Sequence, residues 1–368
     1  MLGAGGLPCH MKKLLLPGLI LFAAAVDASE PYQFLNEIKV GGEGGWDIVT
    51  IDNESRCLYL SHSTKVDVVN LENNTLLNTA ITDTPGVHEF LPIHEFLRGF
   101  SSNGRESKAS VVDLTTLRTI SKLDTGEGPD EMAYDSLRGE VYVFNHKGDS
   151  VTVIGARTAS VTTTIPLGGS PEFAVADSLA HRVYCNLQDK SEVAVIDTTK
   201  HEVIARWPLA PGQEPSGIAF DLAHHRLFST CHNKTMVMLD TESGKVVASV
   251  PIGAGTDGCA FDDAMQLAFA SCGDGTTTIA KEEAPDKLTV VQTLKTERGA
   301  RTMALDPKTH RIYLPTAQFQ AQPPATPKLD ASPARTGSPS TGASPARPTI
   351  VPNTLKLLVY GPTDGAKP

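Results

Sequence analysis

The stretch Asp130-Glu-Met-Ala-Tyr-Asp135, followed by Leu137-Arg-Gly-Glu-Val-Tyr142, decides the fold because it recurs along the chain. Close copies are Glu172–Asp177 with His181–Tyr184, Ser216–Asp221 with His225–Phe228, and Arg301–Asp306 with His310–Tyr313. Weaker copies start at Asp47, His88 and Asp257, so that seven starts are spaced by 41 to 44 residues. Self-similarity at this period is typical of a repeat architecture.

Each repeat contains four short runs rich in β-branched residues, and turn residues separate the runs. In the fourth repeat these runs are Phe173–Ala176, Arg182–Cys185, Glu192–Ile196 and Val203–Trp207. Four strands in a unit of about 40–45 residues are the pattern of a propeller blade. The sequence therefore predicts an all-β fold, a seven-bladed β-propeller.

The last repeat lacks a fourth strand of its own. Its third run is Leu355–Tyr360, after which the chain soon ends. The segment Phe34–Gly42 resembles the fourth run of other repeats, such as Thr162–Leu167 before Gly168-Gly169. We expect this N-terminal strand to complete the last blade, because closure of the ring removes its open edges.

Residues 1–28 read as a secretory signal peptide. Lys12-Lys13 form a basic region, an apolar run covers Leu14–Val26, and small residues precede a cleavage point after Ala28. Met11 is an alternative start to Met1. The apolar run is short for a membrane span. We expect a periplasmic or secreted protein with no transmembrane segment after cleavage.

Residues 29–368 are expected to form the single propeller. Within blade seven, residues 321–349 contain seven prolines together with Ser, Thr, Ala and Gly, which predicts a loop insertion. Without the signal and this insertion, about 44 residues remain for each blade.

Charge and cysteine content exclude several classes of protein. The 368 residues carry a net charge of −10, and binding to a phosphate backbone relies on clustered Lys and Arg. A nucleic-acid-binding propeller is therefore the least favoured hypothesis. Five cysteines follow the signal and none forms a C-x-x-C pair, so buried thiols are expected instead of a disulfide framework or a zinc ribbon.

The chain resembles the YncE-like, YVTN-repeat β-propeller proteins of bacteria. The residues that carry the resemblance are Gly99–Gly104, Val193–Asp197, Glu214–Gly217 and Arg301–Pro307. The resemblance implies a seven-bladed propeller that is exported to the periplasm or cell surface. A literal Tyr-Val-Thr-Asn is absent, and Tyr142–Asn145 comes nearest.

One polar residue per repeat falls where a first strand begins, at the predicted top-face mouth of the central channel. We call this set the mouth ring: Asp47, His88, Asp130, Glu172, Ser216, Asp257 and Arg301. Convergent polar groups in a concavity are the usual sign of a site. Four acids, one Arg and one His suit a small polar, partly cationic ligand or a divalent metal ion. Capping of turns by these side chains is the alternative interpretation.

The loops between second and third strands are expected on the same face. They add a secondary set: Asn103, Asn145, His146 and His232. Asparagine is also a routine turn residue. No histidine pair has local metal-ligand spacing, so no metal ligands are assigned. A third group of histidines recurs at the first hairpin turn on the opposite face, which favours a structural role: His181, His225 and His310.

No catalytic motif is present in the sequence. The leading hypothesis is an exported, non-catalytic binding or scaffold propeller. Its acidic top-face channel would take a small polar ligand, a metal ion or a protein partner. The alternative is a hydrolase or lyase, lactonase-like by analogy of fold, with His88 as the candidate acid/base group.

Overall fold

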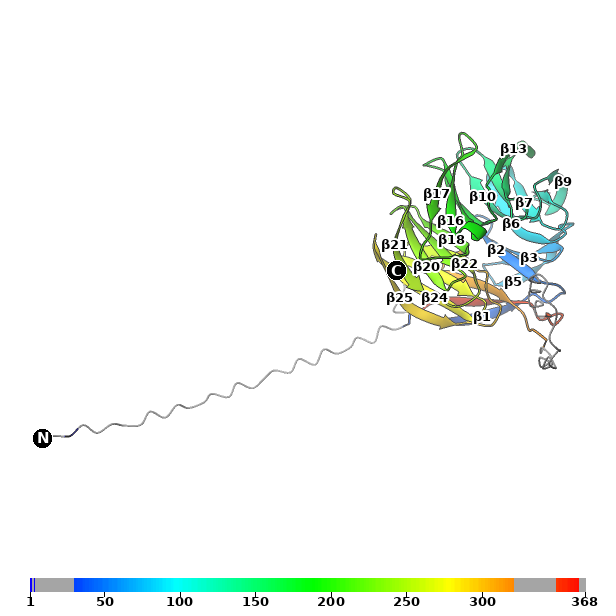
Figure 1. Ribbon diagram of the computed structural model, residues 1–368. Coiled ribbons are helices and arrows are strands. Elements are labelled where there is room, and N and C mark those ends of the chain that lie inside the picture. The colour runs from blue at the N-terminus through cyan, green and yellow to red at the C-terminus, as the bar shows by residue number, and fades with distance from the viewer. Residues whose placement is uncertain (2, 4–29, 321–348, 364–368) are drawn as a thin grey trace, which may run out of the picture.

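The computed structural model describes residues 1, 3, 30–320 and 349–363. These residues form seven four-stranded antiparallel sheets arranged in a ring (Figure 1). The prediction of an all-β, seven-bladed propeller is confirmed. The predicted signal peptide and almost all of the Pro-rich insertion, residues 321–348, lie outside the described residues.

In each blade the first strand is innermost, because first strands of neighbouring blades contact one another. Blades one to three are β2 (Trp46–Asp52), β3 (Cys57–His62), β4 (Lys65–Asn70) and β5 (Thr75–Thr82); β6 (Val87–Ile93), β7 (Arg98–Asn103), β8 (Lys108–Asp113) and β9 (Arg118–Asp124); and β10 (Pro129–Asp135), β11 (Glu140–Asn145), β12 (Ser150–Gly155) and β13 (Ser160–Pro166). Blades four to six are β14 (Pro171–Asp177), β15 (Arg182–Leu187), β16 (Glu192–Asp197) and β17 (Glu202–Pro208); β18 (Pro215–Asp221), β19 (Arg226–Cys231), β20 (Thr235–Asp240) and β21 (Lys245–Pro251); and β22 (Thr256–Asp262), β23 (Leu267–Cys272), β24 (Thr276–Ala284) and β25 (Lys287–Lys295). Two short 3-10 helices, η1 (His94–Phe96) and η2 (Gln188–Lys190), lie in loops.

Blade seven joins the two ends of the chain. It consists of β26 (Ala304–Asp306), β27 (Arg311–Thr316), β28 (Lys356–Pro362) and β1 (Tyr32–Lys39). β1 pairs antiparallel with β28 from Tyr32↔Pro362 to Lys39↔Lys356, and Figure 1 shows the blue β1 among the last strands. The predicted closure by the N-terminal strand is confirmed.

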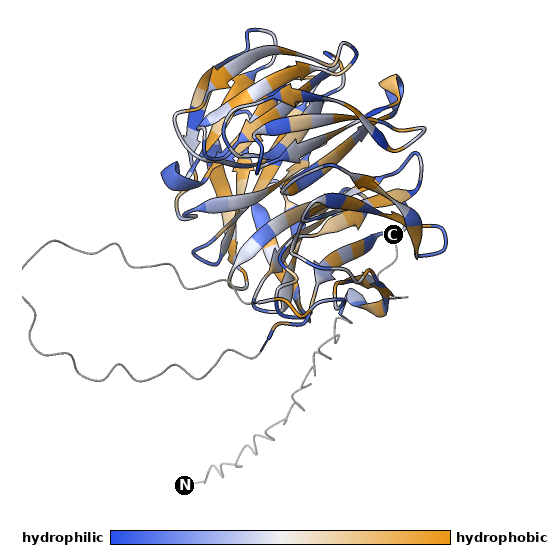
Figure 2. Ribbon diagram, turned by 90° about the vertical axis from the view of Figure 1, so that its right-hand side faces the viewer, coloured by the Kyte–Doolittle hydropathy of each residue, from blue (hydrophilic) through white to orange (hydrophobic). Residues whose placement is uncertain are grey.

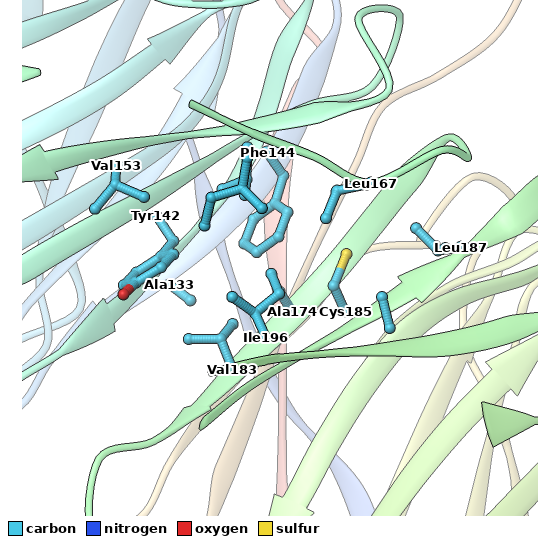
Figure 3. Packing of buried hydrophobic residues seen from close by; sticks show 13 residues of the cluster. Ala133, Tyr142, Phe144, Val153, Leu167, Ala174, Val183, Cys185, Leu187 and Ile196 are labelled. Atoms are coloured by element: carbon cyan, nitrogen blue, oxygen red, sulfur yellow. The ribbon is translucent and has the colours of Figure 1, made fainter. Parts of the chain in front are cut away.

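Apolar side chains fill the spaces between adjacent blades. Between blades three and four, Tyr142 and Phe144 pack toward Val183, Cys185 and Ile196 of the neighbouring sheet (Figure 3). The middle strands are buried on both faces and therefore read as continuous apolar runs, as in Val193–Ile196. In the outermost strand β17, exposed residues alternate with half-buried ones, and hydrophilic residues gather at the turns (Figure 2).

The first hairpin turn has the same backbone in every blade. Its last residue lies in the left-handed region, with φ between 50° and 62°: Arg56, Leu97, Gly139, His181, His225, Gln266 and His310. The aspartate that ends the first strand accepts backbone amides of this turn in an Asx turn, as Asp52 does from Glu54 and Ser55. His181, His225 and His310 occupy this left-handed position of the turn.

The five cysteines among the described residues are all unpaired, and three of them are buried, as the sequence predicts. Within the described part of the chain, no helix has the length and hydropathy needed to cross a membrane.

Replacement of Tyr32 tests the closure of the ring. Its side chain is 1% exposed, its hydroxyl donates to the His310 carbonyl at 2.6 Å, and its ring packs edge-on against Phe269 of blade six. We expect Tyr32→Ala to lower the free energy of unfolding by about 3–5 kcal/mol, as for other buried aromatics. Urea denaturation measures this. The matched control is Phe34→Ala, since Phe34 is 53% exposed, and it should cost about 1 kcal/mol or less. Equal losses would contradict the closure argument.

Candidate functional site

The mouth ring lies at the start of the inner strands. Six of its seven residues occupy the second position of β2, β6, β10, β14, β18 and β22, and Arg301 lies three residues before β26. In each of these six strands the pairing with the second strand shifts at this point, as between Pro129 and Met132 in β10. A bulge takes residues out of the ladder and re-aims their side chains. This irregularity turns the ring residues toward one another at the channel mouth.

Ion pairs connect the ring across five blades. Arg301 forms a salt bridge with Asp257 through Nη1, and its Nη2 lies 3.5 Å from Asp47 Oδ1. His88 Nδ1 lies 2.6 Å from Asp47 Oδ2 and 3.2 Å from Asp130 Oδ1. Ser216 extends the chain on the other side by donating its hydroxyl to Asp257 at 2.8 Å. These three acids and two bases are therefore paired with one another and do not face solvent independently.

His146 joins this arrangement from the loop after β11. Its Nδ1 lies 3.2 Å from Glu172 Oε1 and 2.9 Å from the Pro171 carbonyl. This hydrogen bond to Glu172, against some loss from burial, raises the pKa of His146 to about 9. Its positive charge in turn acts on Asp130. The secondary residue His146 therefore belongs to the mouth, and the charges alternate in sign from Asp257 through Arg301, Asp47, His88, Asp130 and His146 to Glu172.

Ion pairing and burial shift the pKa values of ring residues. Burial alone lowers the pKa of His88, but the hydrogen bond to Asp47 and the charge of Asp130 outweigh it and raise the pKa to about 9. Burial raises the pKa of Asp130 to about 7, although His88 opposes the shift. The acidic excess expected at the mouth is thus largely neutralised by three cationic groups.

Two buried glutamates stand behind the ring. Glu89 is 5% exposed and accepts the Met132 amide of the next inner strand at 2.5 Å. Burial raises its pKa to about 8, with the Met132 amide opposing the shift. Glu131 is 7% exposed, and burial together with the charge of Glu89 raises its pKa well above the usual range. Burial between the inner strands therefore favours the uncharged form of both carboxyl groups.

Sequence reasoning named neither Glu89 nor Glu131 as a site residue. Each glutamate directly follows a ring residue in an inner strand, where acids have poor propensity, and this pattern could have indicated them.

Two of the secondary residues lie inside the blades. Asn103 and Asn145 are fully buried, and their amides donate to Ser110 and to Thr152 of the third strand. These asparagines link strands within one blade and do not reach the channel. His232 lies at the surface with Nδ1 3.9 Å from Glu214, so the structure does not bring it into the ring.

One subset of the ring has the donors for a metal ion. Asp47, His88 and Asp130 each offer a ligand atom within 4.8 Å of the others. One imidazole and two carboxylates fit a first-row divalent ion such as Zn²⁺. Such an ion would have to displace the proton that His88 shares with its two carboxylates.

Comparison with known proteins agrees with this architecture. The chain is 30% identical over 128 residues to a protein of Salmonella typhi and to one of Salmonella typhimurium, both named uncharacterized protein YncE. Over this stretch the chain resembles the YncE proteins. The match covers 33% of this chain and 36% of each relative, so it spans about a third of the curated relatives' length. No family model matches the sequence.

Solved structures share the fold of this chain. Hydrazine synthase of Kuenenia stuttgartiensis superposes with a TM-score of 0.64 at 14% identity, covering 75% of this chain and 93% of that one. A chain of the mitotic checkpoint complex gives a TM-score of 0.65 at 11% identity, covering 83% and 95%. At these identities the likeness concerns the fold alone.

The buried glutamates predict a specific dependence of stability on pH. Because the folded protein holds the Glu89 proton up to about pH 8, whereas an unfolded glutamate loses it near pH 4.5, this group stabilises the fold at low pH. Its contribution is lost as the pH rises through about 8. We expect Glu89→Gln to match the wild type near pH 5 and to become more stable than it by pH 8 to 9. The difference should grow by at most about 1.4 kcal/mol per pH unit.

Urea denaturation at several pH values measures this difference. Glu127→Gln, which changes an exposed glutamate of the same face, is the control and should leave the pH profile unchanged. A Glu89→Gln profile parallel to that of the wild type would show that Glu89 is already ionised in the fold.

Proposed function

We propose that this YncE-like propeller is an exported, non-catalytic binding protein whose channel mouth takes a small polar ligand with both donors and acceptors. The observation that carries this proposal is the alternating row of charges around the mouth. Six charged ring side chains keep between 14% and 36% of their surface exposed, so they remain within reach of a ligand.

The row of charges supports a mixed ligand better than a simple cation. Asp47 and Asp130 offer acceptor oxygens, whereas Arg301 offers guanidinium donors that suit a carboxylate or carbonyl. Because the side chains hold one another in place, a ligand meets an ordered set of groups and pays little to order them. A zwitterion or a polyol matches this pattern.

One observation favours a catalytic alternative. The pKa of Asp130, raised by burial to about 7, places a carboxyl group near the range required of a general base. His88 suits that role less well, because its raised pKa keeps it protonated at neutral pH. In a hydrolase or lyase acting at this mouth, Asp130 would accept the proton and His88 would donate one.

Export is the part of the proposal that rests on the sequence of residues 12–28. We expect the mature protein from the periplasm or culture medium to begin at Ser29. N-terminal sequencing checks this, and a mature chain that retains Lys12 and Lys13 would contradict it.

A thermal-shift screen tests the binding site. We expect a zwitterion or polyol to raise the melting temperature, since a ligand at 100 times its Kd adds about 2.7 kcal/mol. The shift should disappear in Arg301→Gln and in Asp47→Asn. It should persist in Arg298→Gln, which changes an exposed arginine only three residues away.

The other members of the screen separate the alternatives. Turnover of a lactone that stops in Asp130→Asn would favour the hydrolase. A shift caused only by oligonucleotides, and weakened by salt, would favour nucleic-acid binding. A zwitterion or polyol shift that survives Arg301→Gln would overturn the assignment of the mouth ring.

A further inference from the structure

A second cluster of ligand groups lies on the opposite face, at the junction of blades five and six. Asp221 ends β18, His224 follows in the hairpin turn, and Glu282 lies near the end of β24. One ligand atom of each lies within 4.8 Å of the others. His224 Nδ1 is 2.6 Å from Asp221 Oδ2. This cluster belongs neither to the mouth ring nor to the proposed function.

Glu282 is the unusual member. Glu282 is only 5% exposed, yet neither of its carboxylate oxygens has a hydrogen-bond partner among the described residues. A buried carboxylate without partners is costly, because nothing replaces the water it has lost. The unpartnered carboxylate of Glu282 therefore indicates that a cation binds beside it.

The other blades show that the fold does not need an acid here. Glu282 donates its amide to the carbonyl of Gln266, the left-handed turn residue of its own blade. The residues that make the same backbone bond in five other blades are Leu71, Leu114, Ala156, Thr198 and Thr241. None of these is charged, so Glu282 is an exception specific to blade six.

The junctions between other blades provide a second contrast. At three other junctions, the aspartate that ends a first strand receives a basic side chain from the following blade: Arg56 on Asp306, His94 on Asp52 and His310 on Asp262. At the junction of blades five and six, the following blade offers the carboxylate of Glu282 to Asp221 instead. At the other three junctions the base comes from the first hairpin turn, whereas here the third strand places a second acid beside the aspartate.

Nearby charges do not fill the gap. Arg226 donates from Nε to the Pro285 carbonyl at 2.6 Å and from Nη1 to the His224 carbonyl at 2.9 Å, which ties together the two segments that carry the cluster. Asp263 adds a further acid beside Asp221. His224 is the one base of the cluster, and its side chain is 46% exposed.

We propose that Asp221, His224 and Glu282 bind a divalent first-row transition-metal ion that links blades five and six. One imidazole nitrogen and two carboxylates are donors that Zn²⁺ and its neighbours accept, whereas Ca²⁺ and Mg²⁺ favour oxygen ligands alone. The exposed side of His224 leaves room for water as a further ligand. The ion supplies at this junction the positive charge that Arg56 supplies to Asp306 at the junction of blades seven and one.

Zinc titration of the full-length protein tests this proposal. We expect Zn²⁺ to raise the melting temperature by a few degrees, because an ion that binds only the folded state stabilises it. The titration is done in the His88→Ala background as well as in the wild type, so that the mouth ring does not contribute. Glu282→Gln and His224→Ala should each weaken Zn²⁺ binding more than about 10-fold by calorimetry. The matched control His225→Asn changes the neighbouring exposed histidine, tolerates its left-handed backbone and should bind normally.

The stability of the metal-free protein distinguishes a metal site from a proton that Glu282 and Asp221 share. In EDTA, Glu282→Gln should be at least as stable as the wild type, because it removes an acid beside Asp221. With Zn²⁺ the order should reverse. An anomalous-scattering peak at the zinc edge between the three side chains would support the site. Retained Zn²⁺ affinity in Glu282→Gln, or a stability order that is the same with and without Zn²⁺, would overturn it.

Discussion

The pairing of β1 with β28 is the contact on which the rest of the ring depends. Without it, blade seven would keep three strands and present β28 as an open edge. The strand also reaches blade six, where Tyr32 exchanges hydrogen bonds with the side chain of Gln292 and packs on Phe269. Residues more than 300 positions apart must meet for this, and the loop-closure entropy is repaid only by the complete interface.

Closure also assembles the mouth. Arg301 of blade seven lies between Asp257 of blade six and Asp47 of blade one, and Thr302 donates its hydroxyl to the Asp47 carbonyl across the same junction. The row of alternating charges therefore crosses the point where the ring closes. The bulges of the inner strands aim the side chains, and the ring brings them within bonding distance. Preorganisation of the mouth and integrity of the ring are two consequences of one closure.

Repetition lets individual junctions carry different chemistry on one backbone. The first hairpin turn ends in a left-handed residue at each of these junctions. One junction holds an arginine–aspartate pair, and two others hold histidine–aspartate pairs. A fourth holds two carboxylates together with His224. The backbone hydrogen bond that the last carbonyl of the turn accepts recurs in six blades, so the side chains are free to differ. Sites in such a fold are local substitutions on a common frame.

Local sequence patterns are enough to specify the propeller frame. Alternation of apolar residues specifies strands, aspartates and glycines specify turns, and the 41–44-residue period specifies blades, all of which are local properties. The sequence also placed the mouth ring in register and paired β1 with the last blade. Which polar groups meet depends on the tertiary structure. Asn103 turns into its own blade, and His146 pairs with Glu172. Glu131 is buried, and Glu282 lies beside Asp221. These contacts join residues of different blades or different strands, and their geometry depends on bulges and blade packing that no local pattern records.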